Sequence, residues 1–260
     1  RVRRQRQMCI RDSIDEAKGS QLKLIIRGGV GVDNIDVDYA KANGIDVKNT
    51  PKASSQSVAE LAMGHMFSCA RYISIAGHTM REDKWEKKAY GKGIELQGKT
   101  LGIVGFGRIG QHLGVMAKAI GMKVVAFDIF HIPGIEEQLG IPYVEMDELL
   151  AMSDFVSVHA PAVDGGALIS AENIAKMKDG VVVINTSRGT NVDEAALLAA
   201  LESGKVRAAG LDVYADEPAT NKALYSHPMV SCTPHIGAAT NEAQKRIGAE
   251  IVDIITNFGK

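Results

Sequence analysis

A glycine-rich stretch between two apolar runs constrains the fold of this chain more than any other feature. It runs Leu101-Gly-Ile-Val-Gly-Phe-Gly-Arg-Ile-Gly110, and the second apolar run, Lys123–Phe127, ends at Asp128. This order predicts a strand, a tight turn, a helix and a second strand. Such a unit begins a doubly wound, mostly parallel sheet.

Each glycine of this stretch suits a dinucleotide site in a different way. Gly105 permits the tight turn, Gly107 lets a pyrophosphate approach the backbone, and Gly110 lets the helix pack closely on the strand. The first helical turn presents the backbone N–H groups around Arg108 and Ile109 to the phosphates. An ordinary glycine turn is the alternative, which the flanking strand and helix disfavour.

Asp128 indicates which dinucleotide is bound. It ends the second strand, 23 residues after Gly105, where a carboxylate accepts hydrogen bonds from the adenosine ribose. The same charge repels the 2′-phosphate of NADP. The sequence therefore predicts NAD as the cofactor.

Apolar runs rich in valine and isoleucine continue to the end of the chain, alternating with helical segments. Most lack in–out alternation, which is typical of strands covered on both faces. The clearest helical segment has Asp193 at its N-cap and Gly204 just after its end. This alternation predicts an α/β fold with a doubly wound parallel (Rossmann) sheet. The runs are Leu101–Val104, Lys123–Phe127, Phe155–Val158, Val181–Ile184, Ala208–Val213 and Met229–Cys232.

We expect the NAD-binding domain, residues 90–237, to be inserted into a smaller α/β substrate domain built from both ends of the chain. Residues 1–89, with a helical stretch from about Ser57 to Arg81, form its first part, and residues 238–260 return to it as a closing helix. Only two strands are evident before residue 57, too few for an independent sheet. The smaller domain is therefore expected to be truncated or completed by a partner. Arginine-rich residues 1–13 are interpreted as non-native rather than as a nucleic-acid arm.

Composition excludes several classes of partner. The net charge is −1, which gives no bias toward nucleic acid or membranes. The three cysteines have no metal-ligand spacing, and no apolar run is long enough to span a bilayer. We therefore expect a cytoplasmic protein with a small-molecule substrate and with no metal, nucleic acid or membrane partner.

Arg188, Glu217 and His235 each follow a different predicted strand. Because the carboxyl ends of parallel strands lie at the same edge of a sheet, we expect these residues to gather there. Together they suit hydride transfer between nicotinamide and a 2-hydroxy acid. His235 would exchange the hydroxyl proton, and Glu217 would orient its ring and favour the imidazolium. Arg188 would bind the substrate carboxylate and polarise the reacting oxygen. Taken singly, each could instead be a structural residue.

From Leu22 to the C-terminus the sequence resembles the D-isomer-specific 2-hydroxyacid dehydrogenases. Several separate motifs occur in the order found in that family, which is more specific than the glycine pattern alone. They are Arg27–Asp36, Asn49–Pro51, Ser57–Glu60, Val104–Gly110, Asn185–Gly189, Asp216–Pro218 and Pro234–Ala238.

The resemblance implies roles for individual residues. Arg188, Glu217 and His235 are implied as the catalytic set. Contacts with NAD are implied for Gly105, Gly107, Arg108, Ile109, Gly110, Asp128, Ala160, Thr186, Ser187, Asp212, Gly237 and Ala238. Substrate contacts are implied for Arg188 and for the loop of Arg27, Gly28, Gly29, Val30 and Gly31.

The resemblance also implies an activity. The first expectation is NAD-dependent oxidation of D-3-phosphoglycerate to 3-phosphohydroxypyruvate, as in serine biosynthesis. Reduction of hydroxypyruvate or glyoxylate is the alternative, and a corepressor-like NAD-binding interaction module is the alternative without catalysis. A homodimer is expected from the family and from the apolar helix near Leu61–Ala70. No regulatory domain is expected after the closing helix.

Overall fold

The computed structural model describes residues 11–17, 21–163 and 165–259, so most of the arginine-rich segment (residues 1–10) lies outside the described residues. The chain divides into two compact units, each of which is described by itself. The larger contains Gln56–Gly237, and the smaller contains the described residues up to Ser55 and from Ala238 onward. No helix in the described part of the chain is long and apolar enough to cross a membrane.

The larger unit is built on one sheet of six parallel strands, in the order β4-β3-β5-β6-β7-β8. This confirms the predicted α/β class and Rossmann-like sheet. From β3 the chain continues to β4, the outermost strand on one side, and then returns to form β5 on the other side of β3. The direction in which strands are added to the sheet therefore reverses between β3 and β5. Ligands of such sheets bind at the carboxyl ends of the strands beside this point. The strands are β3 (Thr100–Val104), β4 (Lys123–Phe127), β5 (Phe155–Val158), β6 (Val181–Asn185), β7 (Val206–Leu211) and β8 (Val230–Cys232).

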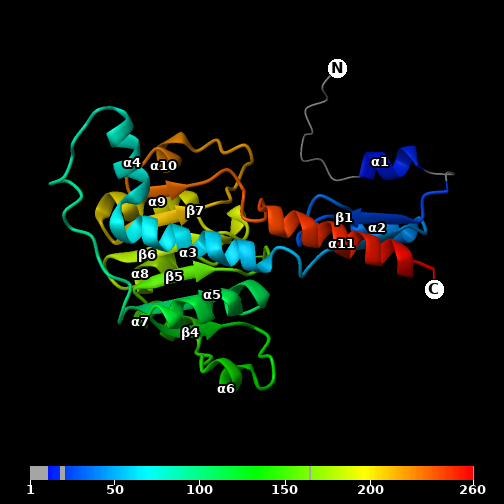
Figure 1. Ribbon diagram of the computed structural model, residues 1–260, viewed down its shortest axis with the longest axis horizontal. Coiled ribbons are helices and arrows are strands. Elements are labelled where there is room, and N and C mark those ends of the chain that lie inside the picture. The colour runs from blue at the N-terminus through cyan, green and yellow to red at the C-terminus, as the bar shows by residue number, and fades with distance from the viewer. Residues whose placement is uncertain (1–10, 18–20, 164, 260) are drawn as a thin grey trace. The chain divides into compact units, whose positions relative to one another are not determined.

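Helices cover both faces of this sheet, as Figure 1 shows. On one face, α3 (Ser55–Arg71) and α5 (Arg108–Ala119) bury their apolar residues against the strands. On the other face, α7 (Met146–Met152), α8 (Ala171–Lys176) and α9 (Glu194–Ser203) form a second apolar core. The remaining short elements are α6 (Ile135–Leu139), a 3₁₀ turn (Gly189–Asn191) and α10 (Lys222–Tyr225).

The ends of α9 lie where the sequence predicts them. The Asp193 carboxylate accepts hydrogen bonds from the amides of Ala195 and Ala196, both at 3.0 Å. Gly204 follows the helix in the left-handed conformation, with φ of 79°. A cap residue and a terminal glycine are local signals, so the helix could be placed without knowledge of its packing.

The helical stretch expected from Ser57 to Arg81 is divided at Tyr72, which has φ of 59°. The second helix, α4 (Ile73–Arg81), starts after this residue. The Tyr72 hydroxyl accepts a hydrogen bond from Arg207 Nη2 at 2.7 Å, and the guanidinium lies over its ring. A contact with a distant strand therefore accompanies the left-handed turn.

Residues 56–71 of α3 group with the larger unit, whereas the sequence predicts residues 1–89 in the smaller domain. Ala62, Met66 and Cys69 are buried in the same core as Leu101 and Ile103 of β3. Packing against the sheet thus ties this helix to the nucleotide-binding unit. Much of the apolar segment Leu61–Ala70, on which the expectation of a dimer partly rested, is used in this core.

The smaller unit contains a parallel pair of strands, β1 (Leu24–Arg27) and β2 (Asp46–Asn49). Its small core joins α1 (Arg11–Glu16) and α2 (Val37–Ala42) through Ile14, Ala40 and Ile45. The last helix, α11 (Asn241–Asn257), is preceded by its N-cap residue Thr240, whose side chain accepts a hydrogen bond from the amide of Ala243.

Candidate active site

The glycine turn after β3 has the geometry that a dinucleotide site requires. Gly105 has φ of 94°, and a Cβ atom there would lie 2.6 Å from the amide nitrogen of Ala160. A Cβ at Gly110 would lie 2.4 Å from the carbonyl oxygen of Gly105, so the helix approaches the turn closely. At Gly107 a Cβ would have no atom within 4 Å among the described residues, which leaves space for a ligand.

Helix α5 begins immediately after Gly107 without a side chain capping its first turn in the described structure. Its first N–H groups, including those of Arg108 and Ile109, are therefore available to an anion. Thr186, after β6, is buried, and its hydroxyl has no hydrogen-bond partner among the described residues. These features fit NAD, which supplies the hydride acceptor when bound.

Asp128 lies at the end of β4, at the rim of the glycine turn. Its Oδ2 accepts a hydrogen bond from the amide of Phe106 at 2.6 Å, and its Oδ1 accepts one from the amide of Phe130 at 3.0 Å. Both oxygens are thus anchored by backbone, which fixes the carboxylate. Contact with the cofactor ribose stays a prediction.

Substitution Asp128→Ala should lower the preference for NAD over NADP by at least about tenfold, because the charge that repels a 2′-phosphate is lost. Steady-state kinetics with both cofactors measure this ratio. Asp179→Ala, which removes an exposed carboxylate paired with Lys205, is the matched control. An unchanged ratio in Asp128→Ala would remove this carboxylate from cofactor selection.

His159, between β5 and Ala160, is a partly buried histidine beside the glycine turn. Its Nε2 lies 2.8 Å from the Ser157 hydroxyl, whereas its Nδ1 has no partner among the described residues. Burial lowers the pKa of His159 from 6.5 to about 3. The ring is therefore neutral in the folded protein at neutral pH.

This pKa makes the fold sensitive to acid. The unfolded chain binds a proton at His159 below about pH 6.5 and the folded chain does not, so stability falls as the pH falls from that value. Between pH 7 and pH 5 this histidine should account for about 2 kcal/mol of lost unfolding free energy. Urea titrations of the wild type and His159→Asn at both pH values test this. The same pH dependence in both proteins would contradict it.

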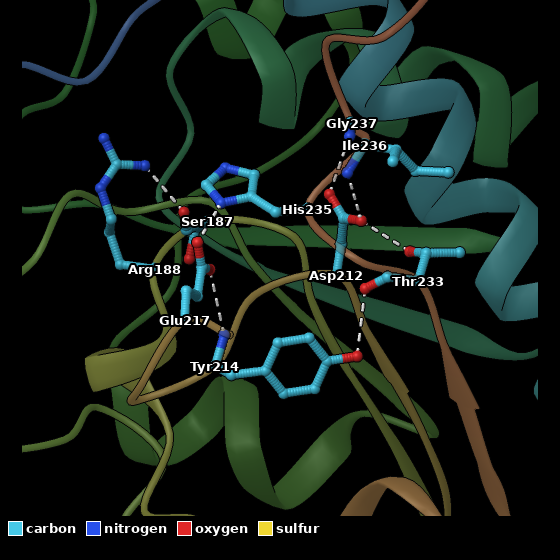
Figure 2. A network of polar contacts seen from close by, with 9 residues as sticks. All are labelled: Ser187, Arg188, Asp212, Tyr214, Glu217, Thr233, His235, Ile236 and Gly237. Atoms are coloured by element: carbon cyan, nitrogen blue, oxygen red, sulfur yellow. Dashed lines mark hydrogen bonds and ion pairs between the residues drawn. The ribbon is translucent and has the colours of Figure 1, made fainter. Parts of the chain in front are cut away.

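His235 and Glu217 form a pair at the carboxyl edge of the sheet. His235 Nδ1 lies 2.7 Å from Glu217 Oε2, and the other carboxylate oxygen accepts a hydrogen bond from the Tyr214 amide at 3.4 Å (Figure 2). A carboxylate accepts only, so the ring donates through Nδ1 and keeps Nε2 for a ligand. The His235 side chain is 52% exposed and that of Glu217 is 20% exposed. This pair lines a cavity of about 420 Å³, which gives a small molecule access to it.

The buried carboxylate of Asp212 holds the loop that carries His235. Its Oδ1 accepts hydrogen bonds from the Ile236 amide at 2.8 Å and the Thr233 hydroxyl at 2.6 Å, and its Oδ2 accepts one from the Gly237 amide at 2.8 Å (Figure 2). The His235 amide also donates to the Asp212 carbonyl at 2.8 Å. These bonds compensate the burial of the charge and fix the backbone on both sides of the histidine.

Arg188 follows β6 in extended conformation, with its Nη1 donating to the Ser187 carbonyl at 2.8 Å. Figure 2 shows its guanidinium on the same side of the network as the His235–Glu217 pair. Since β6, β7 and β8 are neighbours, the three predicted catalytic residues follow three adjacent strands. The larger unit thus gathers an arginine, a carboxylate and a histidine at the edge that also carries the glycine turn.

The predicted substrate loop, Arg27–Gly31, lies in the smaller unit and begins at the last residue of β1. The Gly29 amide donates to the Thr50 hydroxyl at 2.7 Å, and Gly29 itself has φ of 147°. Val30 is 41% exposed. Substrate contact by this loop stays a prediction.

Two further residues belong to the network but were not singled out from the sequence. Tyr214 donates from its hydroxyl to the carbonyl of Thr233 at 3.1 Å, and burial raises the pKa of this phenol. Thr233 binds Asp212 through its side chain. In the sequence, only their proximity to Glu217 and His235 could have indicated that they belong to the site.

Comparison with known proteins identifies the family of this chain. Residues 63–237 match the family model for the D-isomer specific 2-hydroxyacid dehydrogenase, NAD binding domain. The chain therefore belongs to this family of NAD-dependent oxidoreductases, as its motifs predict.

Individual relatives have different substrates. The chain is 52% identical over 242 residues to the hydroxypyruvate reductase of Thermotoga maritima, covering 91% of this chain and 78% of that protein. It is 44% identical over 240 residues to the D-3-phosphoglycerate dehydrogenase of Mycobacterium tuberculosis, covering 92% of this chain but only 45% of that protein. The crystal structure of D-lactate dehydrogenase from Aquifex aeolicus, complexed with NAD and lactic acid, matches with a TM-score of 0.84 and 32% identity, covering 94% of this chain and 84% of that one.

Proposed function

We propose that this chain transfers hydride between NAD and the 2-carbon of a small 2-hydroxy or 2-keto acid, with His235, Glu217 and Arg188 as its catalytic residues. The observation that carries the proposal is the 2.7 Å contact between His235 and Glu217 at the sheet edge that also bears the glycine turn. Family membership supports the same chemistry.

The proposed roles follow from charge. In the oxidation, His235 Nε2 accepts the hydroxyl proton of the substrate while hydride leaves its 2-carbon, so that a carbonyl forms. Glu217 stabilises the resulting imidazolium. Arg188 binds the substrate carboxylate through its planar fork. In the reduction, His235 returns the proton to the carbonyl oxygen.

The substrate proposed from the sequence is D-3-phosphoglycerate, which is oxidised to 3-phosphohydroxypyruvate in serine biosynthesis. Hydroxypyruvate reduction is the second candidate, because the relative at 52% identity carries that name and is matched over 78% of its length. The keto acids of these two reactions, 3-phosphohydroxypyruvate and hydroxypyruvate, differ by one phosphate group. Glyoxylate is the smallest member of the series.

Parallel assays of NADH oxidation with 3-phosphohydroxypyruvate, hydroxypyruvate and glyoxylate test the proposal. A higher kcat/KM for the phosphorylated acid would support the first substrate, and a higher value for hydroxypyruvate would support the second. NAD binding without turnover of any of these acids would favour the interaction module instead. A homodimer is proposed from the family resemblance, and light scattering tests it. A cytoplasmic location is proposed from the composition, and cell fractionation tests it.

A further inference from the structure

His65 is a buried polar residue on an otherwise apolar face of α3. It is 3% exposed and lies among Ala62, Met66 and Cys69 of the core. Its ring is bonded at both nitrogens, with Nδ1 3.0 Å from the Ser231 hydroxyl and Nε2 3.1 Å from the Thr233 hydroxyl. Histidine at this place therefore connects the helix to β8 and to the residue two positions before His235.

The strand next to His65 makes room for it. A Cβ atom at Gly210 of β7 would lie 2.6 Å from the Cβ of His65 and 3.0 Å from its Cγ. The helix therefore approaches the strand closely enough for the ring to reach the end of β8. Any side chain at position 210 would therefore displace His65.

The direction of each hydrogen bond follows from the number of protons. Asp212 Oδ1 lies 2.6 Å from the Thr233 hydroxyl and only accepts, so the single hydroxyl proton of Thr233 points to Asp212. Thr233 must then accept from His65, which places a proton on Nε2. Burial lowers the pKa of His65, although Asp212 opposes the shift, so the ring is neutral at neutral pH. Nδ1 is then an acceptor for the Ser231 hydroxyl.

We infer that His65 is a positioning residue for the loop that carries His235. Its Nε2–H orients the Thr233 hydroxyl, which in turn orients the Asp212 carboxylate, and Asp212 holds the amides of Ile236 and Gly237. His65 acts through these groups and is itself buried. The inference rests on the proposed role of His235.

The first test is turnover in His65→Leu, which removes both hydrogen bonds of the ring. We expect kcat to fall by about tenfold to a hundredfold, because misplacement of a catalytic group is costly. His65→Gln, whose amide nitrogen can replace the Nε2 donor, should recover most of this loss. Thr233→Val should lower kcat by a similar factor, and the double variant His65→Leu/Thr233→Val should be no worse than the poorer single variant.

Ser231→Ala is the matched control. It removes the hydrogen bond at Nδ1 and leaves the contact between Nε2 and Thr233, so its kcat should stay within about twofold of the wild type even if its thermal midpoint falls. An equal loss of kcat in Ser231→Ala and His65→Leu would show a merely structural role and overturn the inference. Additive losses in the double variant would also overturn it.

NMR measurements, which do not depend on turnover, separate this inference from the proposed function. Nitrogen NMR of ¹⁵N-labelled histidine, with His65→Gln used for assignment, should show the proton of His65 on Nε2. The backbone amide shifts of Ile236 and Gly237 should move in His65→Leu and much less in Ser231→Ala. A proton on Nδ1, or unmoved amide shifts, would refute the inference, whereas a wild type that shows these signals but turns over no 2-keto acid would refute the function alone.

Discussion

Replacing His235 with asparagine should lower kcat by about 10²–10⁴-fold and leave the affinity for NAD nearly unchanged. Asparagine can still donate to Glu217, but it cannot exchange a proton with the substrate at neutral pH. The glycine turn and Asp128, which we expect to bind the cofactor, lie after other strands. Steady-state kinetics and titration of NADH fluorescence give the two quantities.

The matched control is His78→Asn, which makes the same change at an exposed histidine of α4 paired with Glu82. Its kcat should equal that of the wild type. Turnover that is unchanged in His235→Asn would remove His235 from its proposed role. A large loss of NADH affinity in that variant would indicate damage to the cofactor site instead.

The second large effect is expected for Arg188→Gln. Loss of the guanidinium removes both the charge for the substrate carboxylate and a donor to the oxygen that develops charge, so kcat/KM should fall by about 10²–10³-fold. Binding of NADH should change little. Lysine at this position should restore only part of the activity, because an ammonium cannot replace a planar fork.

Arg81→Gln is the control for this variant, since the Arg81 side chain donates to the Gly77 carbonyl within α4. Tyr72, directly before this helix, contacts Arg207 at the amino end of β7, opposite the carboxyl ends of the strands. The same kcat/KM in Arg188→Gln and the wild type would contradict the assignment. An equal loss of kcat/KM in Arg81→Gln would indicate that the effect comes from the loss of any positive charge and not from the position of Arg188.

The sheet and the cofactor could be predicted from the sequence because their signals are local. Runs of β-branched residues buried on both faces, such as Val181–Ile184, mark strands without reference to distant contacts. The glycine turn and Asp128 belong to one β-α-β unit, so their spacing along the chain reflects their spacing in the fold. The location of Glu217 and His235 at the same edge of the sheet followed from one rule, that the carboxyl ends of parallel strands lie together.

Other features depend on contacts that the local pattern does not contain. His65 bonds to residues 166 and 168 positions away, and its sequence neighbours are those of an ordinary apolar helix. The break at Tyr72 accompanies contacts with Arg207 on a distant strand. The grouping of α3 with the larger unit likewise depends on which sheet its apolar face covers.

The carboxylate of Asp212 has a consequence for hydrogen exchange. Opening the loop of residues 233–237 would break the bonds to the Ile236 and Gly237 amides and leave a negative charge inside the protein with too few donors. Local opening of this surface loop is therefore costly. Although Ile236 is 41% exposed, we expect its amide and that of Gly237 to exchange with deuterium as slowly as those of the neighbouring strands.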